Sequence, residues 1–402
     1  RRVFDGPVFI NWFGADNRNG TDSSASIQKA LDYVYSLPRG GSLTATPGTY
    51  NISAKITLPN TPNKKINFEA YGCTFVPFGG YTGFLLDVGS ATEVSAIPSR
   101  VAGMTFSAGY LDTRSPSINL SWAGQFTLED ISCLSGGTGV TVANCFALRV
   151  LRFNSAYCNG YGMYFTTICN NLQIVDSFFN SNISGDMYFE QPVYNVSISG
   201  TDMEAGPAAI VFAQGGAGLE MYGNYIEGKT GLPIFFGAEM TGGTFTGNWL
   251  GYNTGAQVWY NWKQGLISDN IFWDQPQSID PSSFVDVGPN AYYGTSDKIL
   301  SSSVNMTLVG GFYSVGGSWA VAKYSKDRSG TVRLAGMVGA SADQVCFVLP
   351  VGFRPSAQIS FVSLGVDKSV GRVLIDVSGN VLVNRGTDGT LDLSAVSFKA
   401  VL

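Results

Sequence analysis

The chain consists mostly of short apolar runs separated by polar turns, and one early stretch has the period of a helix. A helix is predicted over residues 23–37, where apolar side chains recur at i, i+3, i+4 and i+7: Ile27, Ala30, Leu31 and Val34. Thr21 and Asp22 supply polar side chains suited to its N-terminus, and Pro38 ends the pattern. The remaining runs, broken by Gly, Asn, Ser and Asp, predict an all-β protein.

The middle of the chain repeats itself at intervals of 22 to 24 residues. The repeated segments are Leu151–Tyr157, Ile174–Asn180, Ile198–Glu204, Met221–Glu227, Phe245–Gly251 and Ile267–Trp273. Their fourth residues are Asn154, Ser177, Thr201, Asn224, Asn248 and Asn270. A second column of similar period is Met163, Met187, Ile210, Ile234 and Val258. This period without helices predicts a parallel β-solenoid, with the polar column stacked as a ladder inside its turns.

The period is lost after about Ser301, where alternating strands predict a separate antiparallel β-sandwich. The predicted strands are Thr331–Leu334, Arg372–Val377 and Val381–Val383. Turns are predicted at Ser378-Gly379-Asn380 and Thr387-Asp388-Gly389. The predicted domains are an N-terminal cap over residues 1–42, a β-helix over 43–290 and the sandwich over 301–402.

Composition excludes several classes of function. The chain has no histidine, which excludes a Ser-His-Asp triad, a Cys-His dyad, a histidine general base and His-ligated zinc. A net charge of −5 and a pI near 4.9 argue against a nucleic-acid partner. No apolar run reaches the ~20 residues of a membrane span, so no membrane insertion is predicted. The six cysteines form no CxxC pair and are predicted to be reduced core residues. We predict no metal and no cofactor.

Three carboxylates are predicted on one outer face of the solenoid. Strand alternation places the fifth and seventh residues of each repeat outward, which exposes Asp202, Glu204 and Glu227. Adjacent coils lie about 4.8 Å apart, so Glu204 and Glu227 are expected about 5 Å from each other. Glycoside hydrolysis uses two carboxyl groups, about 5 Å apart for retention and about 6.5–9.5 Å apart for inversion. These three residues are therefore the predicted catalytic residues; the alternative is that they are solvated surface acids.

The same columns are rich in aromatic side chains with flat faces suited to sugar rings. The predicted substrate-binding residues are Tyr157, Phe178, Asn180, Tyr225, Trp249, Trp273 and Lys229. The competing interpretation is that the aromatic residues pack between subunits. Further carboxylates that could replace the predicted catalytic ones are Asp176, Asp186, Glu220 and Glu239.

Motifs at both ends of the chain resemble those of known proteins. The N-terminal motif is Asn11-Trp12-Phe13-Gly14-Ala15-Asp16, Asn19-Gly20-Thr21-Asp22, the helix, Gly40-Gly41 and Pro47-Gly48-Thr49-Tyr50. It resembles the cap of pectate-lyase-like β-helix proteins, among them bacteriophage tailspike depolymerases. The C-terminal motif is Leu349-Pro350-Val351-Gly352-Phe353-Arg354-Pro355, Gly379-Asn380-Val381 and Val396-Ser397-Phe398. It is similar to the terminal module of phage tailspikes and tail fibres.

The resemblance implies a homotrimer of right-handed parallel β-helices that binds and cleaves a bacterial capsular polysaccharide or exopolysaccharide. It also implies a place on the virion, attached to the phage tail or baseplate through a region that precedes Arg1. The tailspikes of phages that infect Acinetobacter are the nearest relatives that it suggests.

Three functions remain open at the level of sequence. The first is an endo-acting glycoside hydrolase, the second a polysaccharide lyase on the same fold, and the third a non-catalytic receptor-binding fibre. A lyase needs a base and a cation that neutralises a uronate. The repeat supplies few basic residues: Arg149, Arg152, Lys229 and Lys263. The hydrolase is therefore favoured.

Overall fold

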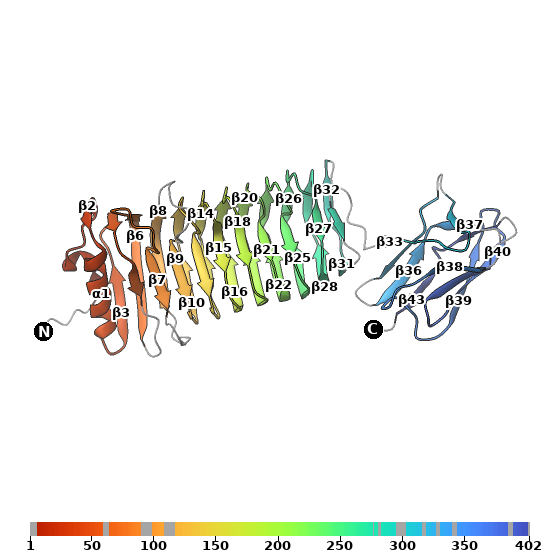
Figure 1. The fold of residues 1–402 in the computed structure, drawn as a ribbon, viewed down its shortest axis with the longest axis horizontal. Coiled ribbons are helices and arrows are strands. Elements are labelled where there is room, and N and C mark those ends of the chain that lie inside the picture. The colour runs from red at the N-terminus through yellow and green to blue at the C-terminus, as the bar shows by residue number, and fades with distance from the viewer. Residues whose placement is uncertain are drawn as a thin grey trace. The chain divides into compact units, whose positions relative to one another are not determined.

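The structure is a computed structural model (Figure 1). It describes residues 6–58, 64–89, 99–107, 117–275, 277–279, 283–294, 303–315, 319–326, 330–339, 344–384 and 389–400. The chain divides into two compact units, residues 1–278 with 288–298 and residues 279–287 with 299–402. The strands β30 (Gln277–Ile279) and β31 (Phe284–Val287) lie where the chain passes between these units.

The first unit is a parallel β-solenoid, as the repeat predicted. Its coils contribute strands to three stacks, and each strand pairs in parallel with its counterparts in the neighbouring coils. The first stack consists of β3 (Gly40–Thr44), β6 (Lys65–Pro77), β8 (Ser99–Ser107), β10 (Phe126–Glu129), β13 (Arg149–Leu151), β16 (Cys169–Val175), β19 (Val193–Ser199), β22 (Gly216–Tyr222), β25 (Met240–Thr246) and β28 (Trp262–Ser268).

The second stack uses shorter strands and carries the predicted site. It consists of β4 (Gly48–Ile52), the second halves of β6 and β8, β11 (Ser132–Leu134), β14 (Asn154–Ala156), β17 (Phe178–Asn180), β20 (Asp202–Glu204), β23 (Tyr225–Glu227), β26 (Trp249–Gly251), β29 (Ile271–Trp273) and β32 (Ala291–Tyr293). The third stack consists of β5 (Ile56–Leu58), β7 (Leu86–Gly89), β9 (Ile118–Ser121), β12 (Val140–Ala143), β15 (Tyr161–Phe165), β18 (Gly185–Phe189), β21 (Ile210–Phe212) and β24 (Ile234–Phe236). Beyond it, β27 (Gln257–Trp259) pairs with β30.

The predicted helix is present as α1 (Ser24–Ser36) and lies at the N-terminal end of the solenoid (Figure 1). Its four predicted apolar residues are fully buried. The Asp22 carboxylate accepts a hydrogen bond of 3.1 Å from the Ser24 N–H, as predicted for a capping side chain. Thr21 does not cap the helix, because its hydroxyl donates instead to the carboxylate of Asp16.

Parallel pairing begins before the helix. The strands β1 (Val8–Phe9) and β2 (Arg18–Asp22) flank the short 3-10 helix η1 (Ile10–Phe13). The strand β1 pairs with β3, and β2 pairs with β4. The cap is thus continuous with the first coils of the solenoid.

The predicted ladder of turn residues is confirmed from Thr201 onward. The backbone N–H groups of Thr201, Asn224 and Asn248 each donate to the side-chain carbonyl of the next asparagine along the stack, at 2.9–3.0 Å. Asn270 donates to Asn290 in the same way. All of these side chains except that of Asn290 are buried, so the ladder satisfies backbone groups that would otherwise lack partners.

The predicted register is wrong at the first interval. Asn154 pairs with Phe178 rather than aligning with Ser177, so this repeat is 24 residues long and not 23. The buried Phe153 occupies the turn position instead, and its N–H donates to the Ser177 hydroxyl at 3.1 Å. An apolar residue thus replaces the polar one on which the alignment relied.

That shift changes the place of Tyr157. Ala156, and not Tyr157, lies opposite Asn180 on the neighbouring strand. Tyr157 follows β14 with a backbone φ of 59° in the left-handed region, and its side chain is 51% exposed. It therefore belongs to a turn between strands and not to the outer column of the second stack.

The third stack confirms the second predicted column as far as Ile234. Met163, Met187, Ile210 and Ile234 pair in consecutive strands. The backbone of Ile234 then exchanges two hydrogen bonds of 2.9 Å with the side chain of Gln257. Two residues later in the same strands, neighbouring phenylalanines stack inside the solenoid at centroid distances of 4.2, 4.8 and 5.5 Å: Phe165, Phe189, Phe212 and Phe236.

The six cysteines are free and buried, as predicted. No described helix is long and apolar enough to span a membrane.

The second unit is antiparallel, as predicted. One sheet consists of β33 (Ser303–Asn305), β35 (Lys323–Lys326), β36 (Thr331–Ala335) and β43 (Ser397–Lys399). The others consist of β34 (Tyr313–Ser314), β37 (Met337–Gly339) and β42 (Thr390–Asp392), and of β38 (Gln344–Val348), β41 (Asn380–Asn384), β40 (Val370–Ile375) and β39 (Ile359–Leu364). Buried residues from all three sheets form one core. The predicted turn at Ser378-Gly379-Asn380 joins β40 to β41, with Gly379 at φ 85°. Of the other predicted turn, Thr387 and Asp388 lie outside the described residues.

Candidate active site

The structure places the three predicted catalytic carboxylates on two adjacent strands. Asp202 and Glu204 belong to β20, and Glu227 lies on β23 directly opposite Glu204. Neighbouring strands lie about 4.8 Å apart, and alternate residues along one strand lie about 6–7 Å apart on the same face. Asp202, Glu204 and Glu227 are all half-buried, and we call them the acidic cluster.

Two neighbouring side chains hold the glutamates of the acidic cluster in place. The Asn180 amide donates to a Glu204 carboxylate oxygen at 3.2 Å. The Tyr225 hydroxyl donates to a Glu227 carboxylate oxygen at 2.9 Å. Burial and this bond to Glu227 raise the pKa of Tyr225 to about 12, so its hydroxyl stays a donor at neutral pH. Each glutamate thus has a partner that orients it.

Asp202 differs from the two glutamates. Burial raises the pKa of its carboxyl to about 6, and the negative charges of Glu204 and Glu227 add to this shift. Its Oδ1 atom is buried and finds no hydrogen-bond donor among the described residues. A carboxyl group whose pKa is raised toward neutrality, beside two other carboxylates, is the arrangement that general acid catalysis uses.

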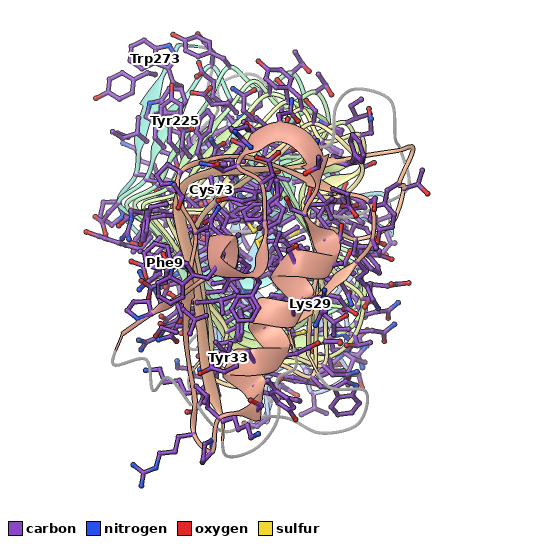
Figure 2. The ribbon with its side chains drawn as sticks, turned by 90° about the vertical axis from the view of Figure 1, so that its left-hand side faces the viewer. Phe9, Lys29, Tyr33, Cys73, Tyr225 and Trp273 are labelled. Carbon is purple, nitrogen blue, oxygen red and sulfur yellow. The ribbon has the colours of Figure 1, made fainter. Side chains whose placement is uncertain are left out.

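Aromatic side chains extend the outer face of the second stack beyond the acidic cluster. Tyr225 and Trp249 stack at a centroid distance of 4.3 Å with their planes 5° apart. Trp273 and Tyr293 stack at 5.1 Å. Seen along the solenoid from the end that carries α1, Tyr225 and Trp273 lie at the same edge (Figure 2). Tyr252 lies between the two pairs, with its ring centroid 6.0 Å from that of Trp249 and 6.5 Å from that of Trp273, so the rings form a continuous aromatic ridge.

The stacking limits which surfaces of the Trp249 ring can contact a sugar. The Trp249 ring lies over Gly251, where an added Cβ would approach the ring to 2.2 Å. One face of the ring is covered by Tyr225. The sequence predicted a free flat face on each aromatic residue, but neighbouring coils bring these rings into contact. What Tyr225 and Trp249 can offer a ligand is the edge and outer surface of a paired stack.

The prediction that Lys229 binds substrate is not supported by its position. The side chain is fully buried, and its ammonium pairs with the Asp186 carboxylate at 2.5 Å. It also donates to the backbone carbonyl of Ala205. Asp202 and Glu204 lie close enough to raise the pKa of Lys229, although burial lowers it overall. Lys229 therefore lies beneath the acidic cluster as a structural cation.

Asp186 is equally unsuited to contact a substrate. It is fully buried, and burial raises the pKa of its carboxyl to about 6 against the opposing effect of Lys229. Its second oxygen accepts from the Asn182 amide at 3.0 Å, and the Asn182 carbonyl accepts from the Ser155 hydroxyl at 3.1 Å. Sequence reasoning missed this network, because lysine and aspartate are seldom fully buried unless paired and the pairing was not visible.

The other predicted binding residues lie at different distances from the acidic cluster. Phe178 lies opposite Asp202 on β17 and is half-buried. Trp273 lies in the column of Glu204 and Glu227, two strands beyond Glu227. Tyr157 lies in the turn after β14 and outside that column, as described above.

The remaining candidate acids are scattered. Asp176 is a left-handed turn residue, and the exposed Glu239 accepts a hydrogen bond from Thr241. Glu220 lines a cavity of about 370 Å³ on the first stack. Among the described residues, no three His, Cys, Asp or Glu side chains are grouped so that they could hold a metal ion.

No protein-family model and no curated protein matches the chain. Solved structures do resemble it in fold. The adhesin PfbA of Streptococcus pneumoniae matches with a TM-score of 0.54 and 12% identity, covering 73% of this chain and 99% of that one. A family 28 exopolygalacturonase of Yersinia enterocolitica matches with a TM-score of 0.54 and 10% identity, covering 73% and 79%. The Dettilon tailspike protein covers 97% and 92% at 11% identity, with a TM-score of 0.40. The first two likenesses show that the chain shares its fold with these two proteins.

Proposed function

We propose that this chain is a phage tailspike that depolymerises a bacterial capsular polysaccharide or exopolysaccharide by endo-glycosidic hydrolysis. The observation that carries the proposal is the acidic cluster, in which the pKa of Asp202 is raised to about 6 beside two oriented glutamates. The solenoid fold supports it by analogy alone, because one similar structure is an exopolygalacturonase. The end motifs that resemble tailspikes supply the phage context.

The roles follow from protonation and spacing. Asp202 donates its proton to the glycosidic oxygen as the bond to the leaving sugar breaks. Glu204 or Glu227 takes a proton from a water molecule that attacks the opposite face of the ring. Asp202 and Glu204 lie about 6–7 Å apart along one strand, and Asp202 and Glu227 lie farther apart on the diagonal to the next strand. These distances match the 6.5–9.5 Å between the two carboxyl groups of inverting enzymes. We therefore propose inversion; direct attack by a glutamate paired at about 5 Å would give retention.

The test is incubation with a panel of capsular polysaccharides, including those of Acinetobacter, followed by mass analysis of the products. Hydrolysis gives oligosaccharides with new reducing ends and no unsaturated uronate. NMR of the first products reports the anomer and so separates inversion from retention. Absence of cleavage across a panel in which one polysaccharide binds the chain would refute the hydrolase.

A lyase is the first alternative, and the site favours it less. It needs a cation beside the substrate carboxylate, and the cation that acts on Asp202 is the buried, ion-paired Lys229. Products that carry an unsaturated uronate would establish it. The second alternative is a non-catalytic receptor-binding fibre, which would bind a polysaccharide and leave its length unchanged.

The proposed assembly is a homotrimer on the virion tail that acts at the bacterial surface. Several large apolar side chains of the solenoid are exposed, among them Ile183 and Tyr222, each at 64%. Apolar surface of this kind is commonly covered by a partner. Light scattering should give three times the 42.8 kDa of one chain, and a stable monomer would contradict the trimer.

A further inference from the structure

A trough runs along the first strand stack, on a different part of the coils from the acidic cluster. Two cavities of about 370 and 280 Å³ share Ala147 and Arg149 in their linings. Together they cross five consecutive strands, from β10 to β22. In Figure 1, β16 and β22 lie toward the lower edge of the solenoid, and β20 and β26 toward the upper edge.

The trough results from a repeated bend. One residue in each coil adopts the left-handed conformation, with φ between 51° and 73°: Gln125, Ala147, Asn171, Asn195 and Gly218. Two residues later comes a column of paired strand positions that are all polar: Thr127, Arg149, Gln173, Ser197 and Glu220. Residues of both columns line the cavities. The column recurs at intervals of 22 to 24 residues, the period already visible in the sequence.

The polar side chains of this column form no ion pair and no side-chain hydrogen bond with other described residues. Arg149 is exposed, and no described carboxylate lies within ion-pair distance of it. By contrast Arg152, three residues later, pairs with Glu129 and Asp130. In a chain with net charge −5, an unpaired guanidinium in a polar concave surface is a site for an anion.

The spacing indicates an extended ligand. The column offers one side chain per strand, about every 4.8 Å, which is close to the length of one pyranose unit in an extended chain. Gln173, Ser197 and Glu220 make no side-chain hydrogen bond within the described part of the chain and are free to bind hydroxyl groups. Glu220 lies three strands from Arg149, about 14 Å away, so a ligand carboxylate is accommodated only at the Arg149 end.

We propose that this trough binds an extended, carboxylated saccharide chain, with Arg149 paired to a carboxylate of the sugar and Gln173, Ser197 and Glu220 bound to its hydroxyl groups. The proposal rests on the proposed function in taking the ligand to be a bacterial polysaccharide, and it adds that this polysaccharide is acidic. The acidic cluster does not provide this contact, because its own carboxylates repel a uronate.

The test compares binding of one polysaccharide and its carboxyl-reduced form. The probe is the capsular polysaccharide that the wild-type chain binds most tightly in the panel, presented to an Asp202→Asn background so that cleavage does not interfere. Arg149→Ala should weaken binding of the native polymer about tenfold or more, because a hydrogen bond between charged groups is lost. The loss should shrink at high salt and vanish for the carboxyl-reduced polymer.

The matched control is Arg39→Ala, which removes another exposed arginine at the N-terminal end of the solenoid and should leave binding unchanged. Wild-type affinity of Arg149→Ala for the native polymer would overturn the trough while leaving the hydrolase intact. A chain that binds without cleaving, but depends on Arg149, would refute the hydrolase and keep the trough. Binding of no polysaccharide in the panel would overturn both.

Discussion

The acidic cluster and the trough are built from the same coils, yet they treat polar side chains in opposite ways. In the acidic cluster, Glu204 and Glu227 lie directly opposite each other on adjacent strands, and Asn180 and Tyr225 hold them. In the trough, Arg149 has no described partner. Like charges placed opposite one another destabilise a sheet, whereas an exposed arginine costs little.

This difference indicates what each surface is for. A solenoid face has no structural need for three neighbouring carboxylates, so their presence points to chemistry that uses a shifted pKa. The trough carries no such cost, which suits recognition without reaction. Substitutions in the two surfaces should therefore differ in their effects on turnover, stability, pH dependence and affinity.

The largest effect is expected from the glutamates. One of the two glutamates, Glu204 or Glu227, activates the attacking water, and the other is its charged neighbour. At least one of the variants Glu204→Gln and Glu227→Gln should therefore lower turnover by about 10²–10⁴-fold. The rate of new reducing ends on the cleaved polysaccharide measures this. Glu239→Gln, which changes an exposed acid elsewhere on the solenoid, is the control. Wild-type turnover in both glutamate variants would remove the acidic cluster from the mechanism.

The next effect is on stability. Lys229→Met leaves the Asp186 carboxylate buried without its cation, which should cost about 3–5 kcal/mol in the free energy of unfolding. Denaturant unfolding followed by tryptophan fluorescence measures the loss. Adding Asp186→Leu should recover much of it, since both charges are then gone. Arg149→Met in the trough should change the free energy of unfolding by less than about 0.5 kcal/mol. A loss as large as that of Lys229→Met would contradict the difference between the two surfaces.

Asp202 should give the site its pH dependence. As the acid, it must be protonated, so the hydrolysis rate should fall by about tenfold per pH unit above about 6. Because its folded-state pKa is raised, the folded chain binds the proton more tightly than the unfolded chain, and this stabilising contribution is lost as pH rises from about 4 to about 6. Asp202→Asn should abolish the decline in rate along with most activity. A rate that stays level from pH 5 to pH 8 would assign the acid role to another group.

The smallest effect is expected at the aromatic ridge. Trp249→Ala removes the stack on Tyr225 and should weaken saccharide binding by about 1 kcal/mol, in the range measured for aromatic pairs. The affinity is measured by titrating the saccharide into the variant, which also carries Asp202→Asn so that cleavage does not interfere. Trp249→Phe keeps a flat ring and should retain most of it. A larger loss in turnover than in affinity would instead mean that Trp249 orients Tyr225 and Glu227.

Much of the solenoid was predictable because residues at the same position of successive repeats pair in neighbouring strands. Where an asparagine recurs at the turn, as at Asn224, Asn248 and Asn270, the ladder fixes which residues face outward. The position of Glu204 opposite Glu227 followed from that register. The prediction failed at Asn154, because the turn position of that coil holds the buried Phe153 and the polar signal was missing.

The sequence by itself therefore determined the period, the alternation of inward and outward residues and the column of carboxylates, since these depend on positions within one repeat. Only the tertiary structure decided how side chains meet across coils. Lys229 finds Asp186 43 residues away and becomes buried, and Trp249 lies flat on Tyr225. These outcomes depend on which rotamers fill the space between neighbouring coils. Close packing determines the rotamers of several side chains jointly, so no single position in the sequence predicts them.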